Sequence, residues 1–105
     1  DDFDLKPGSA NSIQPGKRML SSMTPTIVAK NGTLLMVTGA EGGRTIISTV
    51  LHTILNVLDH GMNAQEAVDA PRFYHQWLPD LIKYEKHGLS ADTVRALASK
   101  GHTLE

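Results

Sequence analysis

The dipeptide Asn31-Gly32 is the feature that most constrains what this chain can fold into. It separates two runs rich in apolar and β-branched residues, 26–30 and 33–38. Asparagine and glycine tolerate the positive φ angles of a type I′ turn, so this pattern predicts an antiparallel hairpin. The second run is nearly all apolar, which predicts a strand covered on both faces.

A glycine pair and a helix follow the hairpin. Apolar residues recur with helical spacing from Thr45 to about Asp59 and form one broad stripe: Ile46, Ile47, Val50, Leu51, Ile54, Leu55 and Leu58. Gly42 and Gly43 stand just before this helix. A helix N-terminus offers free N–H groups, and glycine lets a ligand approach the backbone, so this turn could bind a phosphate, a carboxylate or an oxyanion. A plain strand-to-helix turn is an equally good interpretation of the spacing alone.

The second half of the chain predicts shorter elements. Asn63 and Glu66 have capping-box spacing at the start of a short helix, which Pro71 ends. A strand is expected over 81–85, and Ser90 caps a last helix. The order loop, β, β, α, α, β, α places the chain in the α+β class. The chain opens in an irregular segment and stops just after a helix, so we expect a domain truncated at both ends.

Composition excludes several classes of function. The 105 residues carry a net charge of −1, without a basic face for nucleic acid or a polybasic run for a membrane surface. There is no cysteine, which excludes disulfides and thiolate catalysis. The five histidines lack metal-ligand spacing, so neither a metal site nor a cofactor is expected. Trp77 and Tyr84 are expected in a core or an interface.

Two polar clusters are further candidates for binding. Ser21 and Ser22 offer adjacent hydroxyls that could orient a carboxylate, although a turn or strand start is the commoner reason for such a pair. Neither serine lies in a G-x-S-x-G elbow, which argues against a nucleophile. Asp1, Asp2 and Asp4 could pair with an ammonium group, although a solvated loop explains them as well.

Taken together, these segments resemble the small-subunit region of gamma-glutamyltranspeptidases. The resemblance covers essentially the whole chain, residues 1–105. The matching stretches are Asp1-Asp2-Phe3, Pro15-Gly16-Lys17-Arg18, Leu20-Ser21-Ser22-Met23-Thr24-Pro25-Thr26, Gly39-Ala40-Glu41-Gly42-Gly43 and Pro71-Arg72-Phe73-Tyr74-His75-Gln76-Trp77-Leu78-Pro79. The serine and glycine segments are more specific together than either is alone.

The resemblance implies part of an N-terminal-nucleophile hydrolase fold, a four-layer αββα sandwich made from a self-cleaving precursor. It implies γ-glutamyl transfer from glutathione to amino acids, peptides or water, through an acyl-enzyme on an N-terminal threonine. By motif, Asp2 would bind the glutamyl ammonium, and Ser21 and Ser22 its carboxylate. Gly42 and Gly43 would form the oxyanion hole. The large subunit of the same precursor would be the partner, and the family implies a periplasmic or extracellular location.

Three departures from the family pattern qualify this expectation. The nucleophilic threonine is not in this sequence, so we expect the chain alone to be inactive. The stretch between Gly8 and Pro15 is short, as in members without a lid loop. Met19 replaces a usual proline, and Glu41 places a carboxylate beside the glycines, where it would weaken anion binding or point to solvent.

Two other interpretations stay open at this point. A related acylase of the same fold, acting on cephalosporins or polyglutamate, would use similar serine and glycine segments to bind its substrate. A non-catalytic module that binds an anion at the glycine turn would need neither a nucleophile nor a second subunit.

Overall fold

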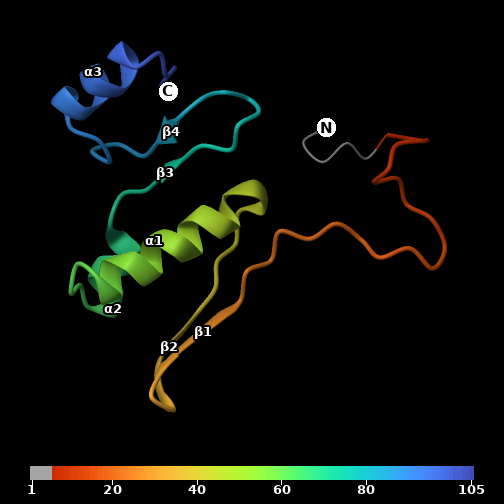
Figure 1. Ribbon diagram of the computed structural model, residues 1–105, viewed down its shortest axis with the longest axis horizontal. Coiled ribbons are helices and arrows are strands. Elements are labelled where there is room, and N and C mark those ends of the chain that lie inside the picture. The colour runs from red at the N-terminus through yellow and green to blue at the C-terminus, as the bar shows by residue number, and fades with distance from the viewer. Residues whose placement is uncertain (1–5) are drawn as a thin grey trace.

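The computed structural model describes residues 6–105, which form an α+β arrangement (Figure 1). The elements are β1 (Thr26–Lys30), β2 (Thr33–Thr38), the 3-10 turn η1 (Gly43–Thr45), α1 (Ile46–Leu58), α2 (Ala64–Asp69), β3 (Phe73–Tyr74), β4 (Lys83–Tyr84) and α3 (Ala91–Ser99). The predicted order is confirmed, with β3 as an addition. A strand of two residues is too short to leave a periodic signal in a sequence.

The hairpin forms around the predicted turn. Asn31 and Gly32 have φ angles of 52° and 78°, as a type I′ turn requires. Lys30 pairs with Thr33 directly across the turn, and the ladder continues to Thr26 and Thr38 with one irregularity after Val28. The predicted antiparallel hairpin is therefore confirmed, and its two-residue turn sets the register next to the turn.

The prediction that β2 is covered on both faces is wrong for this chain. Among residues 6–105, β2 pairs with β1 alone in a two-stranded sheet, and α1 is the helix that packs near it. Leu34 and Val37 remain 60% and 66% exposed. One helix can cover one side of a sheet, so the remaining apolar side chains have no cover within the described residues.

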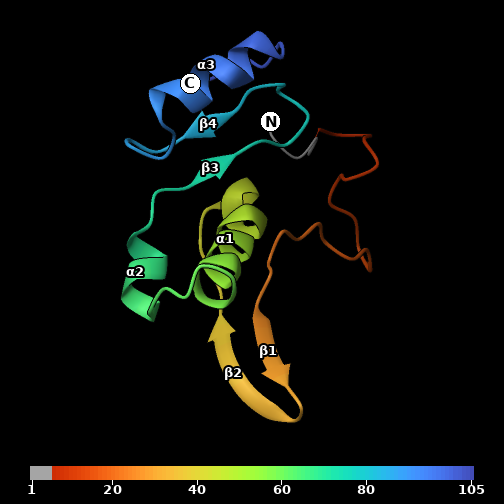
Figure 2. The same ribbon diagram turned by 60° about the vertical axis from the view of Figure 1, so that its left-hand side comes forward.

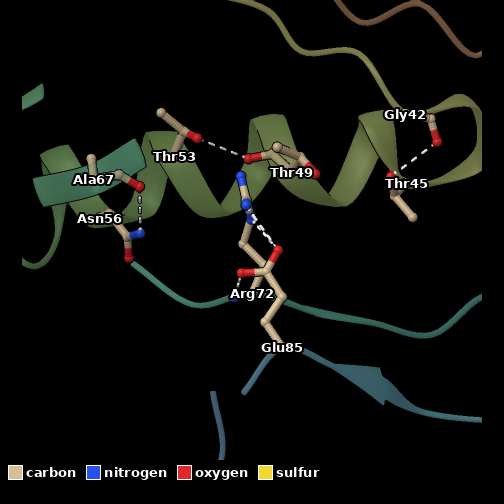
Figure 3. Close-up of polar contacts among 8 residues, drawn as sticks. All are labelled: Gly42, Thr45, Thr49, Thr53, Asn56, Ala67, Arg72 and Glu85. Atoms are coloured by element: carbon tan, nitrogen blue, oxygen red, sulfur yellow. Dashed lines mark hydrogen bonds and ion pairs between the residues drawn. The ribbon is translucent and has the colours of Figure 1, made fainter. Parts of the chain in front are cut away.

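Helix α1 forms the centre of the small core. Ile46 and Val50 on its inner side are buried, whereas Ile47 and Leu51 on the same apolar stripe are more than half exposed. Helix α2 packs beside α1 through the buried Ala67. The Asn56 amide crosses between the helices and donates to the Ala67 carbonyl at 3.3 Å (Figure 3).

Helix α2 begins with the predicted capping box. The Asn63 side chain accepts from the Glu66 N–H at 3.0 Å, and the Glu66 carboxylate accepts from the Asn63 N–H at 2.9 Å. These bonds satisfy two N–H groups that the helix itself leaves without partners. The helix ends at Asp69, two residues before Pro71.

A second small ribbon lies beside α1 and carries α3 (Figure 2). Phe73 pairs with Tyr84, and Tyr74 with Lys83. The strand predicted over 81–85 is thus shorter than expected, although the buried Ile82 extends it by a parallel bridge to Leu104. Ser90 caps α3 as predicted, because its hydroxyl accepts from the Thr93 N–H at 3.1 Å.

Residues 6–25, named the arm here, contain no helix or strand and extend away from the helices before reaching β1 (Figure 1). The arm carries exposed apolar side chains, with Ile13 94% and Met19 79% exposed. Trp77, in the loop between β3 and β4, is 78% exposed. Trp77 was expected in a core or an interface, and its exposure excludes the core of the described residues, whereas a position in an interface stays a prediction.

Candidate functional site

The backbone between β2 and α1 requires glycine. Gly42 and Gly43, named the glycine turn here, have φ angles of 127° and 59°, in the left-handed region that side chains disfavour. A Cβ atom on Gly42 would lie 2.5 Å from Thr45 Oγ1, which is a steric clash. Glycine at position 42 is therefore a structural requirement as well as a candidate ligand contact.

The glycine turn uses its carbonyls for internal bonds. The Gly42 carbonyl accepts from the Thr45 N–H at 3.2 Å and from the Thr45 hydroxyl at 3.0 Å (Figure 3). The Gly43 carbonyl accepts from the Ile46 N–H. Within the part of the chain that the structure describes, the N–H groups of Gly42 and Gly43 have no hydrogen-bond partner. Because both residues are exposed, the turn presents two N–H donors able to bind an anion.

The structure brings one of the two serines to the glycine turn. The Ser22 hydroxyl donates to the Gly43 carbonyl at 2.8 Å, across 21 positions of sequence. The Ser21 hydroxyl instead accepts from the Met23 N–H at 3.2 Å, within the arm. Ser21 is exposed and Ser22 half-buried. Asp2, with Asp1 and Asp4, lies outside the described residues.

The arm is closed on itself just before the serines. The Lys17 ammonium donates to the Ala10 carbonyl and, at 3.2 Å, to the Ser12 carbonyl. Ser12 is the buried polar residue of this segment, with 9% of its surface exposed. Lys17 therefore closes the short stretch from Gly8 to Pro15 into a compact loop.

Two hollows adjoin the glycine turn on the side of the β3–β4 ribbon. One, of about 370 Å³, is lined by both glycines and by Tyr74 and Lys83. The other, of about 510 Å³, runs along Thr45 and Ser48 of α1. Sequence reasoning missed Tyr74 and Lys83, because only the packing of the ribbon against α1 places them there. Glu41 is exposed at the edge of the second hollow.

An ion pair lies at the far end of the second hollow. Arg72 Nη2 and Nε lie 2.8 Å and 3.0 Å from Glu85 Oε1, and the Arg72 N–H donates to Oε2 at 3.1 Å (Figure 3). The hydrogen bond from the Arg72 side chain holds the pKa of Glu85 below its usual value. The Arg72 charge is thus already compensated in this hollow.

His52 lies beside the ion pair on α1. Its ring centroid is 4.6 Å from that of Phe73. Burial, aided by the nearby charge of Arg72, lowers the pKa of His52, so the ring is neutral at pH 7. A neutral ring packed on Phe73 is a structural contact of α1 with β3.

Residues 6–105 include no cluster of three or more metal-binding side chains. No helix in this range has both the length and the apolar character that a membrane crossing needs.

Comparisons with known proteins match the whole chain. The sequence profile of the family described as Gamma-glutamyltranspeptidase matches residues 1–105. The Glutathione hydrolase proenzyme of Escherichia coli (strain K12) is 50% identical over 114 residues, which cover 99% of this chain but 20% of that protein. The chain therefore spans about one fifth of the length of this curated relative.

Solved structures agree with the sequence match. A mutant of Helicobacter pylori gamma-glutamyltranspeptidase superposes with a TM-score of 0.88 at 47% identity, covering 99% of this chain and 61% of that one. The Pseudomonas nitroreducens enzyme complexed with L-DON gives a TM-score of 0.82 at 39% identity, over 100% of this chain and 55% of that one. On the match of both sequence and fold, the chain belongs to the gamma-glutamyltranspeptidase family.

Proposed function

We propose that the complete protein transfers γ-glutamyl groups from glutathione and related donors to amino acids, peptides or water. Membership of the family supports this reaction, and one observation in this chain carries it. Ser22 and Gly43 meet at 2.8 Å, beside two N–H groups that have no partner among the described residues. This bond brings Ser22 next to the glycine turn, where an acyl donor with a carboxylate at one end would need hydroxyl and backbone donors.

The serines and glycines would act on different parts of the donor. Ser21 and Ser22 would donate to the α-carboxylate of the glutamyl group, for which the Ser22 hydroxyl would turn from the Gly43 carbonyl to the substrate. Asp2 would accept from the α-ammonium. The N–H groups of Gly42 and Gly43 would donate to the oxygen of the reacting carbonyl as it becomes negatively charged. Such donors act where charge develops, so they stabilise the transition state more than the bound substrate.

The nucleophile would come from outside these residues. An N-terminal threonine, made by self-cleavage of a precursor, would attack the γ-carbonyl with its own α-amine as base. The large subunit of that precursor would complete the site and cover the exposed side chains of β2. In the complete protein, β1 and β2 would then belong to the inner layers of a four-layer αββα sandwich. We propose a periplasmic or extracellular location on the family likeness alone.

The experiment is expression of the complete gene product and assay with a γ-glutamyl anilide. We expect the precursor to cleave itself into two subunits and to release the coloured aniline. A stable, uncleaved polypeptide without turnover would overturn the proposal. Cleavage followed by turnover of only a cephalosporin side chain or a polyglutamate would instead favour the related acylases.

A further inference from the structure

Thr45 controls the orientation of one peptide group in the glycine turn. The Gly42 carbonyl and the Gly43 N–H belong to the same planar trans peptide, so they point in opposite directions. Thr45 holds that carbonyl with two donors, its N–H at 3.2 Å and its hydroxyl at 3.0 Å (Figure 3). By holding the carbonyl toward α1, Thr45 directs the Gly43 N–H away from the helix.

This peptide group needs such a restraint more than most. Rotating its plane changes ψ of Gly42 and φ of Gly43, and glycine tolerates both orientations at little steric cost. After rotation, the Gly42 carbonyl would stand where the Gly43 N–H now points. A carbonyl oxygen there would repel a developing oxyanion, whereas the N–H stabilises it.

The fit between the two residues supports this role. Thr45 Oγ1 would lie 2.5 Å from a Cβ atom on Gly42, so the hydroxyl occupies space that only glycine at position 42 leaves free. The hydroxyl also bonds to an acceptor three residues earlier in the sequence, so it needs no partner from the rest of the protein. Residues 42–45 thus form a self-contained unit.

We propose that Thr45 is a positioning residue for the oxyanion hole: its hydroxyl locks the Gly42–Gly43 peptide so that the Gly43 N–H faces the reacting carbonyl oxygen. The inference rests on the γ-glutamyl transfer proposed for the complete protein. Thr45 itself does not touch the donor in this role. Its effect is therefore on the transition state and on tetrahedral analogues, with little effect on ground-state binding.

The test compares Thr45→Val, Thr45→Ser and wild type in the complete, self-cleaved protein with a γ-glutamyl anilide. Valine keeps the shape and removes the hydroxyl, and the Thr45 N–H bond remains. Losing one of two hydrogen bonds predicts a fall in kcat of about 3- to 10-fold for Thr45→Val, with KM within about twofold. Serine restores the hydroxyl, so we expect Thr45→Ser to stay within about twofold of wild-type kcat.

Affinity measurements distinguish a misoriented Gly43 N–H from a general loss of ligand binding. A boronic acid that carries the glutamyl amine and carboxylate forms a tetrahedral adduct, and its affinity should fall in Thr45→Val by the same factor as kcat. Affinity for glutamate, whose γ-carboxylate is planar and forms no tetrahedral adduct, should not change. Thr53→Val is the matched control, because the Thr53 hydroxyl makes an equivalent bond within α1 to the Thr49 carbonyl at 3.0 Å (Figure 3).

Wild-type kcat in Thr45→Val would overturn the inference, as would equal losses of boronate and glutamate affinity. If Thr45→Val does not fold or self-cleave, Thr45→Ser decides: a folded serine variant with a tenfold loss of kcat overturns the role of the hydroxyl. An inactive wild-type protein would instead reject the proposed γ-glutamyl transfer, so the two failures are distinguishable.

Discussion

The unit formed by α1 and α2 and the arm formed by residues 6–25 reach their structures by different routes. The helical unit is specified by signals within a few residues: an apolar stripe, a capping box and a glycine turn. The arm has no helix or strand. Side-chain bonds from Lys17 to two carbonyls and from Ser22 to one help to hold it. The candidate site lies where the two meet. One half of it is therefore set by local backbone chemistry and the other half by tertiary contacts.

The largest loss of activity is expected for a substitution at Gly42. Gly42→Ala would force a Cβ atom against the Thr45 hydroxyl and strain a backbone with φ of 127°. We expect kcat on a γ-glutamyl anilide to fall by about 10²-fold or more, because an oxyanion donor is displaced. Steady-state kinetics of the complete protein provide the measurement.

Gly39→Ala is the matched control for Gly42→Ala. Gly39 has no positive φ, and a Cβ atom there meets nothing within 4 Å. A kcat close to wild type is expected for this variant. Equal losses in Gly39→Ala and Gly42→Ala would show that any alanine in this segment harms the enzyme, and the specific role of the glycine turn would have to be withdrawn.

Lys17 tests the arm in the same assay. Lys17→Met removes the ammonium that closes the loop over the Ala10 and Ser12 carbonyls. We expect KM for the γ-glutamyl anilide to rise about 3- to 10-fold with kcat little changed, because the arm carries the serines proposed to bind the ground-state carboxylate. The same change at Lys30, exposed at the hairpin, is the control for lost charge. A fall in kcat alone, at constant KM, would contradict this division of roles.

The capping box of α2 gives a smaller, local effect. Asn63→Ala removes the acceptor for the Glu66 N–H, which typically costs about 1 kcal/mol. We expect faster hydrogen exchange in α2, and unchanged exchange in the arm, because the cap acts within one turn of helix. Gln65→Ala removes only an exposed side-chain bond to Asp69 in the same helix, so it should accelerate exchange less than Asn63→Ala. Protection that is lost throughout the protein would mean that α2 is not an independent local unit.

The smallest expected effect is at Glu85. Its pKa is lowered in the folded protein, chiefly by the hydrogen bond from Arg72. The unfolded chain therefore binds the proton more tightly, and the pair stabilises the fold above the pKa that Glu85 has in the unfolded chain. That contribution is lost as pH falls below this value. Both side chains are at least one third exposed, so we expect at most about 1 kcal/mol at neutral pH.

Glu85→Gln should reduce the loss of unfolding free energy between pH 7 and pH 3. Urea unfolding followed at pH 7 and at pH 3 checks this, with Glu41→Gln as a control, since Glu41 is exposed and has no ion-pair partner among the described residues. A variant whose stability falls with acid as steeply as wild type would show that the Arg72 pair does not report on folding.

Features that depend on neighbouring residues could be predicted from the sequence. The Asn31-Gly32 turn, the start of α1 and the Asn63 cap depend on φ preferences and on bonds to residues at most four positions away, so sequence patterns predicted them. The burial of the β2 side chains, in contrast, depends on which other elements pack against the strand. An apolar run predicts burial, but within residues 6–105 only α1 is available to cover β2.

The sequence by itself determined the hairpin turn, the helices and the glycine turn, because each follows from the conformational limits of a few neighbouring residues. It also carried the family likeness from which the roles proposed for Asp2, Ser21 and Ser22 come. Only the tertiary structure decided that Ser22, rather than Ser21, reaches Gly43, and that Tyr74 and Lys83 border the same turn. Such contacts join segments that are distant in the sequence, and the preferences of neighbouring residues do not specify how these segments come together.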